Sequence, residues 1–176
     1  MNRRQAIRIG GVFMLFTALT AYGAFAPPTS DQVAAAAADP EAHMAALLKD
    51  ASADQAAGVV REVIEGVVGL NLPGDQRDAR LAAVVSGALE ALPANLRGAI
   101  ASALGGKLAG STAVASTPGV MEVVKSAIFA SGGGGALGAA LLASFNQSFQ
   151  SGGGAPPPVP HPRPPTASSY PGQTIP

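Results

Sequence analysis

The chain has 176 residues, of which 37 are alanine and 22 are glycine, so a third of its side chains offer little surface to a core. It contains no cysteine, which excludes disulfides and thiolate metal sites. Eleven basic and eleven acidic residues balance to a formal net charge of zero, and the basic residues do not gather into a face that would bind nucleic acid. The length predicts a single domain.

The first 26 residues are basic and then apolar. Arg3, Arg4 and Arg8 precede a largely apolar run over residues 9–26, whereas all eleven carboxylates lie further along the chain, from Asp31 onwards. This order is typical of a secretory signal, whose charged start stays in the cytoplasm while the apolar part enters the bilayer. We therefore expect export to the periplasm, the cell envelope or the medium.

The end of this segment leaves two outcomes open. Ala24-Phe25-Ala26 offers the small residues that a signal peptidase recognises, but Pro27 follows directly and makes a poor substrate. The segment is therefore either a cleaved signal peptide or an uncleaved anchor. The anchor is physically allowed, because a helix of the 18 residues 9–26 is marginally long enough to cross a bilayer. Its arginines resemble a twin-arginine signal, although Ala6 stands where such signals carry a bulky apolar residue.

Residues 27–38 are interpreted as a linker of small residues, with an alanine run that could extend the next helix. Beyond it, prolines mark the starts of helices, because proline fits the first turn and is disfavoured inside a helix. They occur at Pro40, Pro73, Pro93 and Pro118.

Between these prolines apolar residues recur every three or four positions, which places them on one face of a helix. The stripes predict one helix starting at Asp39 and five more over residues 54–70, 74–91, 94–109, 119–130 and 136–149. Arg61 and Glu65 lie one turn apart and are expected to pair on the wet side of the second helix. The predicted fold class is all-α, a small bundle of about five or six short helices over residues 39–150.

Residues 127–145 form a run of nineteen without a charged side chain. Its length suits a membrane span, but the four glycines at 132–135 weaken a continuous helix. Two interpretations stay open: two helices joined by a glycine turn, or a hairpin or span that enters a membrane.

Residues 151–176 form a Gly- and Pro-rich tail. Prolines account for nine of the 22 residues from position 155 onwards, and such a composition cannot bury a core. The sequence predicts a disordered tail that acts as a spacer or a docking strip.

Few residues in the body could carry chemistry. Asp39, Glu41 and His43 include its one histidine but do not share a helix face, which argues against a metal site. Glu62 and Glu65 share a face but lack the Glu-x-x-His partners of a di-iron site, and no Gly-x-Ser-x-Gly sequence presents a nucleophile. We therefore expect no catalytic, cofactor-binding or metal-binding residues.

The leading hypothesis is an exported, non-enzymatic helical protein with a structural or adaptor role in the cell envelope. It would bind an unidentified protein or associate with itself through Ala-rich helix faces, and it would not bind nucleic acid. The alternative is a membrane-associated protein that inserts residues 127–145, its N-terminal segment, or both. A secreted hydrolase with an unrecognised site is a more distant third.

Overall fold

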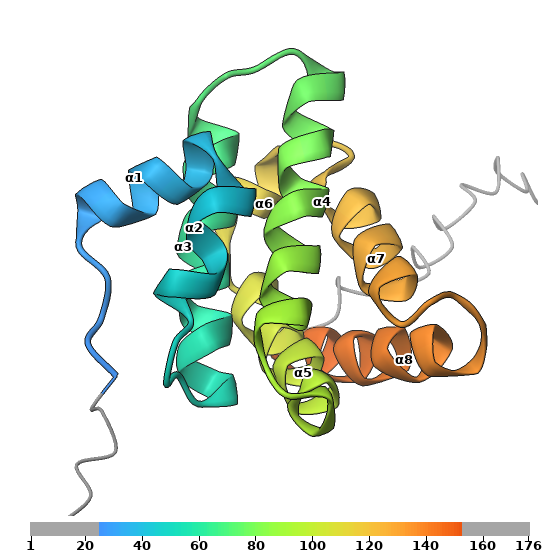
Figure 1. The fold of residues 1–176 in the computed structure, drawn as a ribbon. Helices are drawn as coiled ribbons and strands as arrows, with labels where there is room; N and C mark the ends of the chain where they lie inside the picture. The colour runs from blue at the N-terminus through green and yellow to red at the C-terminus, as the bar shows by residue number, and fades with distance from the viewer. Residues whose placement is uncertain (1–24, 153–176) are drawn as a thin grey trace, which may run out of the picture.

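The computed structural model of the protein describes residues 25–152, which form a bundle of helices (Figure 1). Within this range there are eight α-helices, one short 3₁₀ helix and no strand, which confirms the all-α fold class. The helices are α1 (Ser30–Ala38), α2 (Pro40–Leu47), α3 (Ala53–Gly69), α4 (Gly74–Ala91), η1 (Ala94–Leu96), α5 (Arg97–Ala109), α6 (Thr112–Ser116), α7 (Val120–Ser131) and α8 (Gly135–Gly152). The expected signal or anchor and the expected tail lie almost entirely outside the described residues.

The core of the bundle is built around α3 and α4, which pack against each other. On its other sides α3 contacts α1 and α5, while α4 contacts α2 and α7, and α8 packs against α5 and α7. Figure 1 shows α1 and α2 at the left of the molecule, α7 at the right, and α8 along the lower right. The largest fully buried side chains come from most of these helices: Met44, Leu48, Ile64, Leu81, Leu89, Ile100, Leu108, Ile128 and Phe145.

All four prolines that the sequence marks as helix starts stand at or just before one. Pro40 is the first residue of α2, and the Asp39 carboxylate accepts a hydrogen bond from the Ala42 amide at 3.3 Å. Pro73 directly precedes α4, and Pro93 directly precedes η1, which runs on into α5. Pro118 stands two residues before α7. Proline spacing therefore locates the helices to within a few residues.

The structure corrects the expected linker over residues 27–38, because α1 occupies most of it. Thr29 caps this helix: its hydroxyl accepts from the Gln32 amide, while the Gln32 side chain accepts from the Thr29 amide. Ala36 and Ala37 are buried, and Ala37 packs closely against Gly66 of α3. Alanine favours a helix, and its small side chain lets α1 approach α3, so the segment belongs to the body.

A short helix, α6, was not predicted from the sequence. Five residues are too few to show a helical period, so its only local signal is the N-cap. The Ser111 hydroxyl accepts a hydrogen bond from the Val114 amide at 3.4 Å, and Val114 is buried in the core.

Residues 127–145 belong to two helices joined by a glycine turn, as the first of the two interpretations predicts. The turn is closed by hydrogen bonds from the Gly133 amide to the Ala130 carbonyl at 2.8 Å and from the Gly134 amide to the Phe129 carbonyl at 3.2 Å. Gly133 and Gly134 have positive φ angles of 73° and 67°, which side-chain-bearing residues rarely adopt. No helix between residues 25 and 152 combines the length and apolarity that a membrane crossing requires.

α8 packs unusually close to α5. A Cβ atom on Gly105 would collide with the Phe145 carbonyl, so only glycine fits at this point. The hydroxyls of Ser102 and Ser148 form a hydrogen bond at 2.6 Å across the same contact. The helix continues to Gly152, slightly beyond the expected end of the body at residue 150.

Candidate functional site

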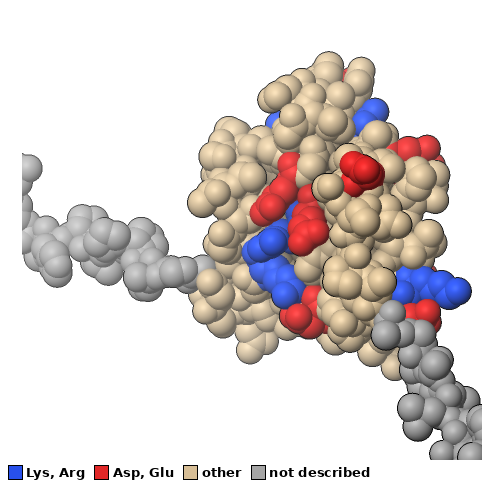
Figure 2. All heavy atoms as spheres, turned by 90° about the vertical axis from the view of Figure 1, so that its left-hand side faces the viewer, with Lys and Arg blue, Asp and Glu red and all other residues tan. Residues whose placement is uncertain are grey.

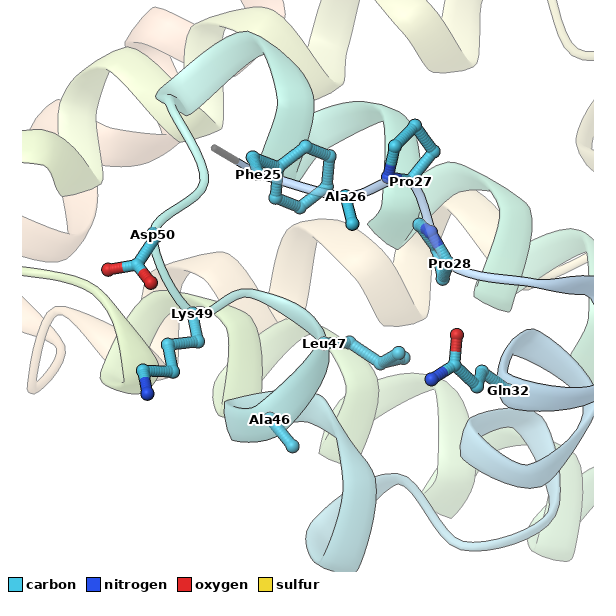
Figure 3. Close-up of a pocket in the computed structure, with 9 residues that line it drawn as sticks. All are labelled: Phe25, Ala26, Pro27, Pro28, Gln32, Ala46, Leu47, Lys49 and Asp50. Carbon is cyan, nitrogen blue, oxygen red and sulfur yellow. The ribbon is translucent and has the colours of Figure 1, made fainter. Parts of the chain in front are cut away.

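One hollow on the surface, which we call the first hollow, lies where the described chain begins (Figure 3). It is bounded by residues 25–28, the start of α1 and the end of α2. Its volume is about 300 Å³. It is lined by Phe25, Ala26, Pro27, Pro28, Gln32, Ala46, Leu47, Lys49 and Asp50. Phe25 also packs against the core, so this wall of the hollow is held by the bundle itself.

The lining of this hollow is mixed, with an apolar wall and a polar, charged edge. Phe25 and the two prolines form one wall, and the side chains of Leu47 and Gln32 extend towards each other below them (Figure 3). Lys49 and Asp50 carry their charged groups on the side away from the prolines. Phe25, Leu47 and the prolines offer apolar contacts to a ligand, and Gln32, Lys49 and Asp50 offer polar ones.

Two more hollows adjoin the first along α2. One, of about 290 Å³, shares Gln32, Ala46 and Leu47 with it and lies between α1 and α2. The other, of about 460 Å³, shares Lys49 and Asp50 and reaches the end of α4 and η1. Shared lining residues make the three hollows neighbours, and together they border much of the exposed side of α2; we call them the α2 hollows.

The described residues are more acidic at their start than further along the chain. Residues 25–54 carry five carboxylates against the single base Lys49, which gives −4, whereas residues 55–152 carry six acidic and six basic groups and are neutral. Asp31 borders the second hollow and Asp50 borders the first and third. Neither belongs to one of the four ion pairs formed within residues 25–152. The lining of the α2 hollows therefore combines apolar residues with the acids Asp31 and Asp50 and the base Lys49.

The residues that the sequence singles out as weak metal candidates do not form a site. The Asp39 carboxylate caps α2, and His43 is exposed at the second hollow. Between residues 25 and 152 no three His, Cys, Asp or Glu side chains are grouped so that they could hold a metal ion.

Glu65 joins α3 to the start of α6, and a separate ion pair joins α3 to α5. It pairs with Arg61 at 3.8 Å, as the sequence predicts, and it accepts a hydrogen bond of 2.7 Å from the Ser111 hydroxyl at the start of α6. Lys107 of α5 pairs with Asp54 of α3 at 2.9 Å. Figure 2 shows acidic and basic side chains next to one another on the face of the molecule that is at the left of Figure 1. These contacts give Asp54, Arg61 and Glu65 of α3 structural roles.

The opposite end of the molecule is uncharged. No charged side chain occurs from Ser126 to Gly152, and the hairpin of α7 and α8 projects at the right of Figure 1. Phe129 and Leu137 are 41% and 56% exposed on it. The hairpin tip is thus apolar, whereas Glu122 and Lys125 form an ion pair earlier on α7.

The residues that line the first hollow were not identified from the sequence. Lys49 and Asp50 carry a weak local signal, because Asp50 has a φ of 62°, a conformation that Asp tolerates better than most residues. The hollow itself depends on Phe25 folding back against α2, and sequence periodicity does not predict such a tertiary contact.

No protein-family model matches the chain, and the comparisons with curated proteins and with solved structures give no match.

Proposed function

We propose that this protein is an exported, non-catalytic adaptor of the cell envelope that binds a protein partner through the α2 hollows. The observation that carries the proposal is that Asp31 and Asp50, neither of which belongs to an ion pair within residues 25–152, border hollows with apolar walls. Other polar side chains, such as Asp39, Ser111 and Lys107, form caps and ion pairs that hold helices together.

The chemistry of the hollows indicates the kind of partner. An apolar segment fills the walls made by Leu47 and the prolines, and a neighbouring basic residue is attracted to Asp31 or Asp50. The partner is therefore expected to offer a short apolar segment flanked by Lys or Arg. Such a contact is small, which suits a reversible adaptor rather than a permanent complex.

A second candidate function is peripheral membrane association. It is favoured by one observation, the uncharged hairpin with its exposed Phe129 and Leu137. It is compatible with the adaptor role, because the hairpin and α2 lie on opposite sides of the body (Figure 1).

Export is tested by cell fractionation with carbonate extraction of the membranes. We expect the full chain in the envelope fraction, because Arg3, Arg4 and Arg8 and the apolar run direct it there. Changing the three arginines to glutamate should hold the protein in the cytoplasm, whereas deleting residues 153–176 should leave export unchanged. Full-length wild-type protein free in the cytoplasm would contradict the proposal.

Binding at the α2 hollows is tested by two matched substitutions on one helix. Ala46→Arg fills the first and second hollows from an exposed position, so the amount of protein partner cross-linked in the envelope should fall. Ala42→Arg is equally exposed on α2 but borders neither hollow, and it should leave the cross-linked partner in place. Equal losses in both variants would show that the hollows are not the binding site.

A further inference from the structure

The tip of the α7–α8 hairpin exposes a compact apolar surface. It consists of Phe129, Ala130, Gly133, Ala136, Leu137 and Ala140, which we call the hairpin surface. Phe129 and Leu137 are two of the three large hydrophobic side chains that stand exposed between residues 25 and 152; the third is Leu70. Phe129 and Leu137 stand on either side of the glycine turn, and the nearest charged residue along α7 is Lys125, one turn before Phe129 and paired with Glu122. Two such exposed side chains form a surface that water solvates poorly.

The backbone of the turn holds this surface in place. Gly132 and Gly138 are in backbone contact, and a Cβ atom on Gly138 would collide with the Phe129 carbonyl. The Phe129 ring in turn lies beside Gly134. Phe129 and Leu137 are therefore presented on a rigid turn, which lowers the ordering cost of any contact they make.

Only the tip of the uncharged segment is available for contact. Ile128, Leu141 and Phe145 are at most 3% exposed and belong to the core of the bundle. Inserting all of residues 127–145 into a membrane would require the bundle to open, whereas the hairpin surface can make contact with α7 and α8 folded. Of the possible membrane contacts, the folded bundle therefore allows only a shallow one, made by the hairpin surface.

The surroundings of the hairpin surface favour lipid as its occupant. A surface without charges can enter the headgroup and upper acyl region without desolvating an ion. The described residues carry a net charge of −4, and the unpaired acids Asp31 and Asp50 border the α2 hollows and not the hairpin, so anionic lipid does not attract the body. In addition, the apolar residues 9–26 join the body at Phe25 and would tether it to a bilayer.

We propose that the hairpin surface is a lipid-contacting site that enters the interfacial region of a bilayer while α7 and α8 stay folded. The proposal rests on the envelope location proposed above. The N-terminal segment attaches the protein to the bilayer first and so keeps the hairpin surface close to lipid. A lipid contact of the hairpin surface that would be too weak alone then forms because it is intramolecular. Because the surface is uncharged, zwitterionic lipid serves as well as anionic lipid, and salt has little effect.

The absence of cysteine from the chain allows a site-specific test. The variants Leu137→Cys and Leu70→Cys of the full chain each carry one environment-sensitive fluorophore and are reconstituted into phosphatidylcholine vesicles, with and without phosphatidylglycerol. Leu70 is the matched control, because it is 43% exposed but lies at the end of α3, away from the hairpin. Spin labels on the lipid acyl chains should quench the probe at position 137 and shift its emission to the blue, in both lipids and at high salt. The probe at position 70 should do neither.

Three further outcomes decide against the proposal. Equal quenching at both positions would show that the body adheres without preference. Quenching that requires phosphatidylglycerol would show that electrostatic attraction to anionic lipid, and not the apolar hairpin surface, holds the protein at the bilayer. Disulfide formation or energy transfer between position 137 of two chains, with no quenching by lipid, would make the hairpin surface a contact with a second copy. Adding Phe129→Asp to the labelled Leu137→Cys chain should abolish the quenching, with circular dichroism verifying that the helices remain.

The result separates this inference from the proposed function. A chain found in the envelope fraction whose probe at position 137 is not quenched would overturn the lipid contact and leave the adaptor role standing. A chain found in the cytoplasm would overturn the adaptor role, whatever the vesicle result.

Discussion

Gly105 in α5 lies so close to Phe145 in α8 that the Phe145 carbonyl oxygen occupies the place a Cβ atom would take. The two helices therefore pack backbone to backbone, and the hydrogen bond between Ser102 and Ser148 lies along the same contact. α8 also lacks charged residues with which to form ion pairs. Its position consequently depends on small residues and buried apolar side chains.

Gly105→Ala should destabilise the protein by about 1–3 kcal/mol, because the new methyl group forces α8 away from α5. Gly98 provides the control on the same helix, since nothing lies within 4 Å of the Cβ that alanine would add there. Gly98→Ala should be neutral or should stabilise the protein by up to about 1 kcal/mol, because alanine lowers the conformational entropy of the unfolded chain. Urea unfolding measures both. Similar free energies of unfolding for the two variants would show that the close packing is absent in solution.

The packing of α1 on α3 can be tested at two neighbouring alanines. Ala37→Leu should cost about 1–3 kcal/mol, because Ala37 is 1% exposed and lies against Gly66. Ala38→Leu, at an exposed position, should change the free energy of unfolding by less than about 0.5 kcal/mol. If residues 27–38 were a linker in solution, both substitutions would be silent in thermal unfolding.

Ser111→Ala should destabilise by about 1–3 kcal/mol, because Ser111 is 4% exposed, caps α6 and donates to Glu65. Ser116→Ala, at the exposed end of the same helix, is expected to fall within about 0.5 kcal/mol of wild type. A double-mutant cycle with Glu65→Ala should show a coupling of about 1 kcal/mol between the two side chains. If the effects of the two substitutions on the free energy of unfolding are additive, Ser111 stabilises the protein only by capping α6 and not through Glu65.

Removing residues 153–176 should change the free energy of unfolding by less than about 0.5 kcal/mol, because a Pro-rich segment has little to bury. Removing residues 149–176 also deletes Phe149, whose ring stacks on Phe145 with centroids 6.0 Å apart. That stacking contact alone should add a cost of about 0.5–1.5 kcal/mol. A large drop in melting temperature for the shorter deletion would show that the tail packs against the helices.

Most of the helices were predictable from the sequence because the signals that set them are local. A proline fits a first turn wherever it occurs, and an apolar stripe requires only that one side of the helix be buried. The Arg61–Glu65 pair follows from the same helical spacing and is confirmed. α1 was missed because the burial of Ala36 and Ala37 depends on Gly66, nearly thirty residues further along the chain.

The α2 hollows could not be predicted for a related reason. They arise where Phe25, Leu47 and Leu96 come together from three separate parts of the chain, and none of these residues belongs to a motif. The hairpin surface was closer to prediction, since the uncharged stretch and its glycines are visible in the sequence. Which apolar residues face outwards was not, because that depends on how α8 meets α5 and α7.

Phe25 and Ala26 line the first hollow and are also the last residues of the expected signal segment. Cleavage after Ala26 would remove Phe25 and Ala26 from the lining and leave the ammonium group of Pro27 as the new start of the chain, so maturation would enlarge the hollow and add a positive charge at its edge. Phe25 packs against the core, so the peptidase would have to act before the bundle closes over it. Proteolytic processing and the shape of the binding surface are thereby coupled, and the precursor and the mature protein would differ in the ligand they accept.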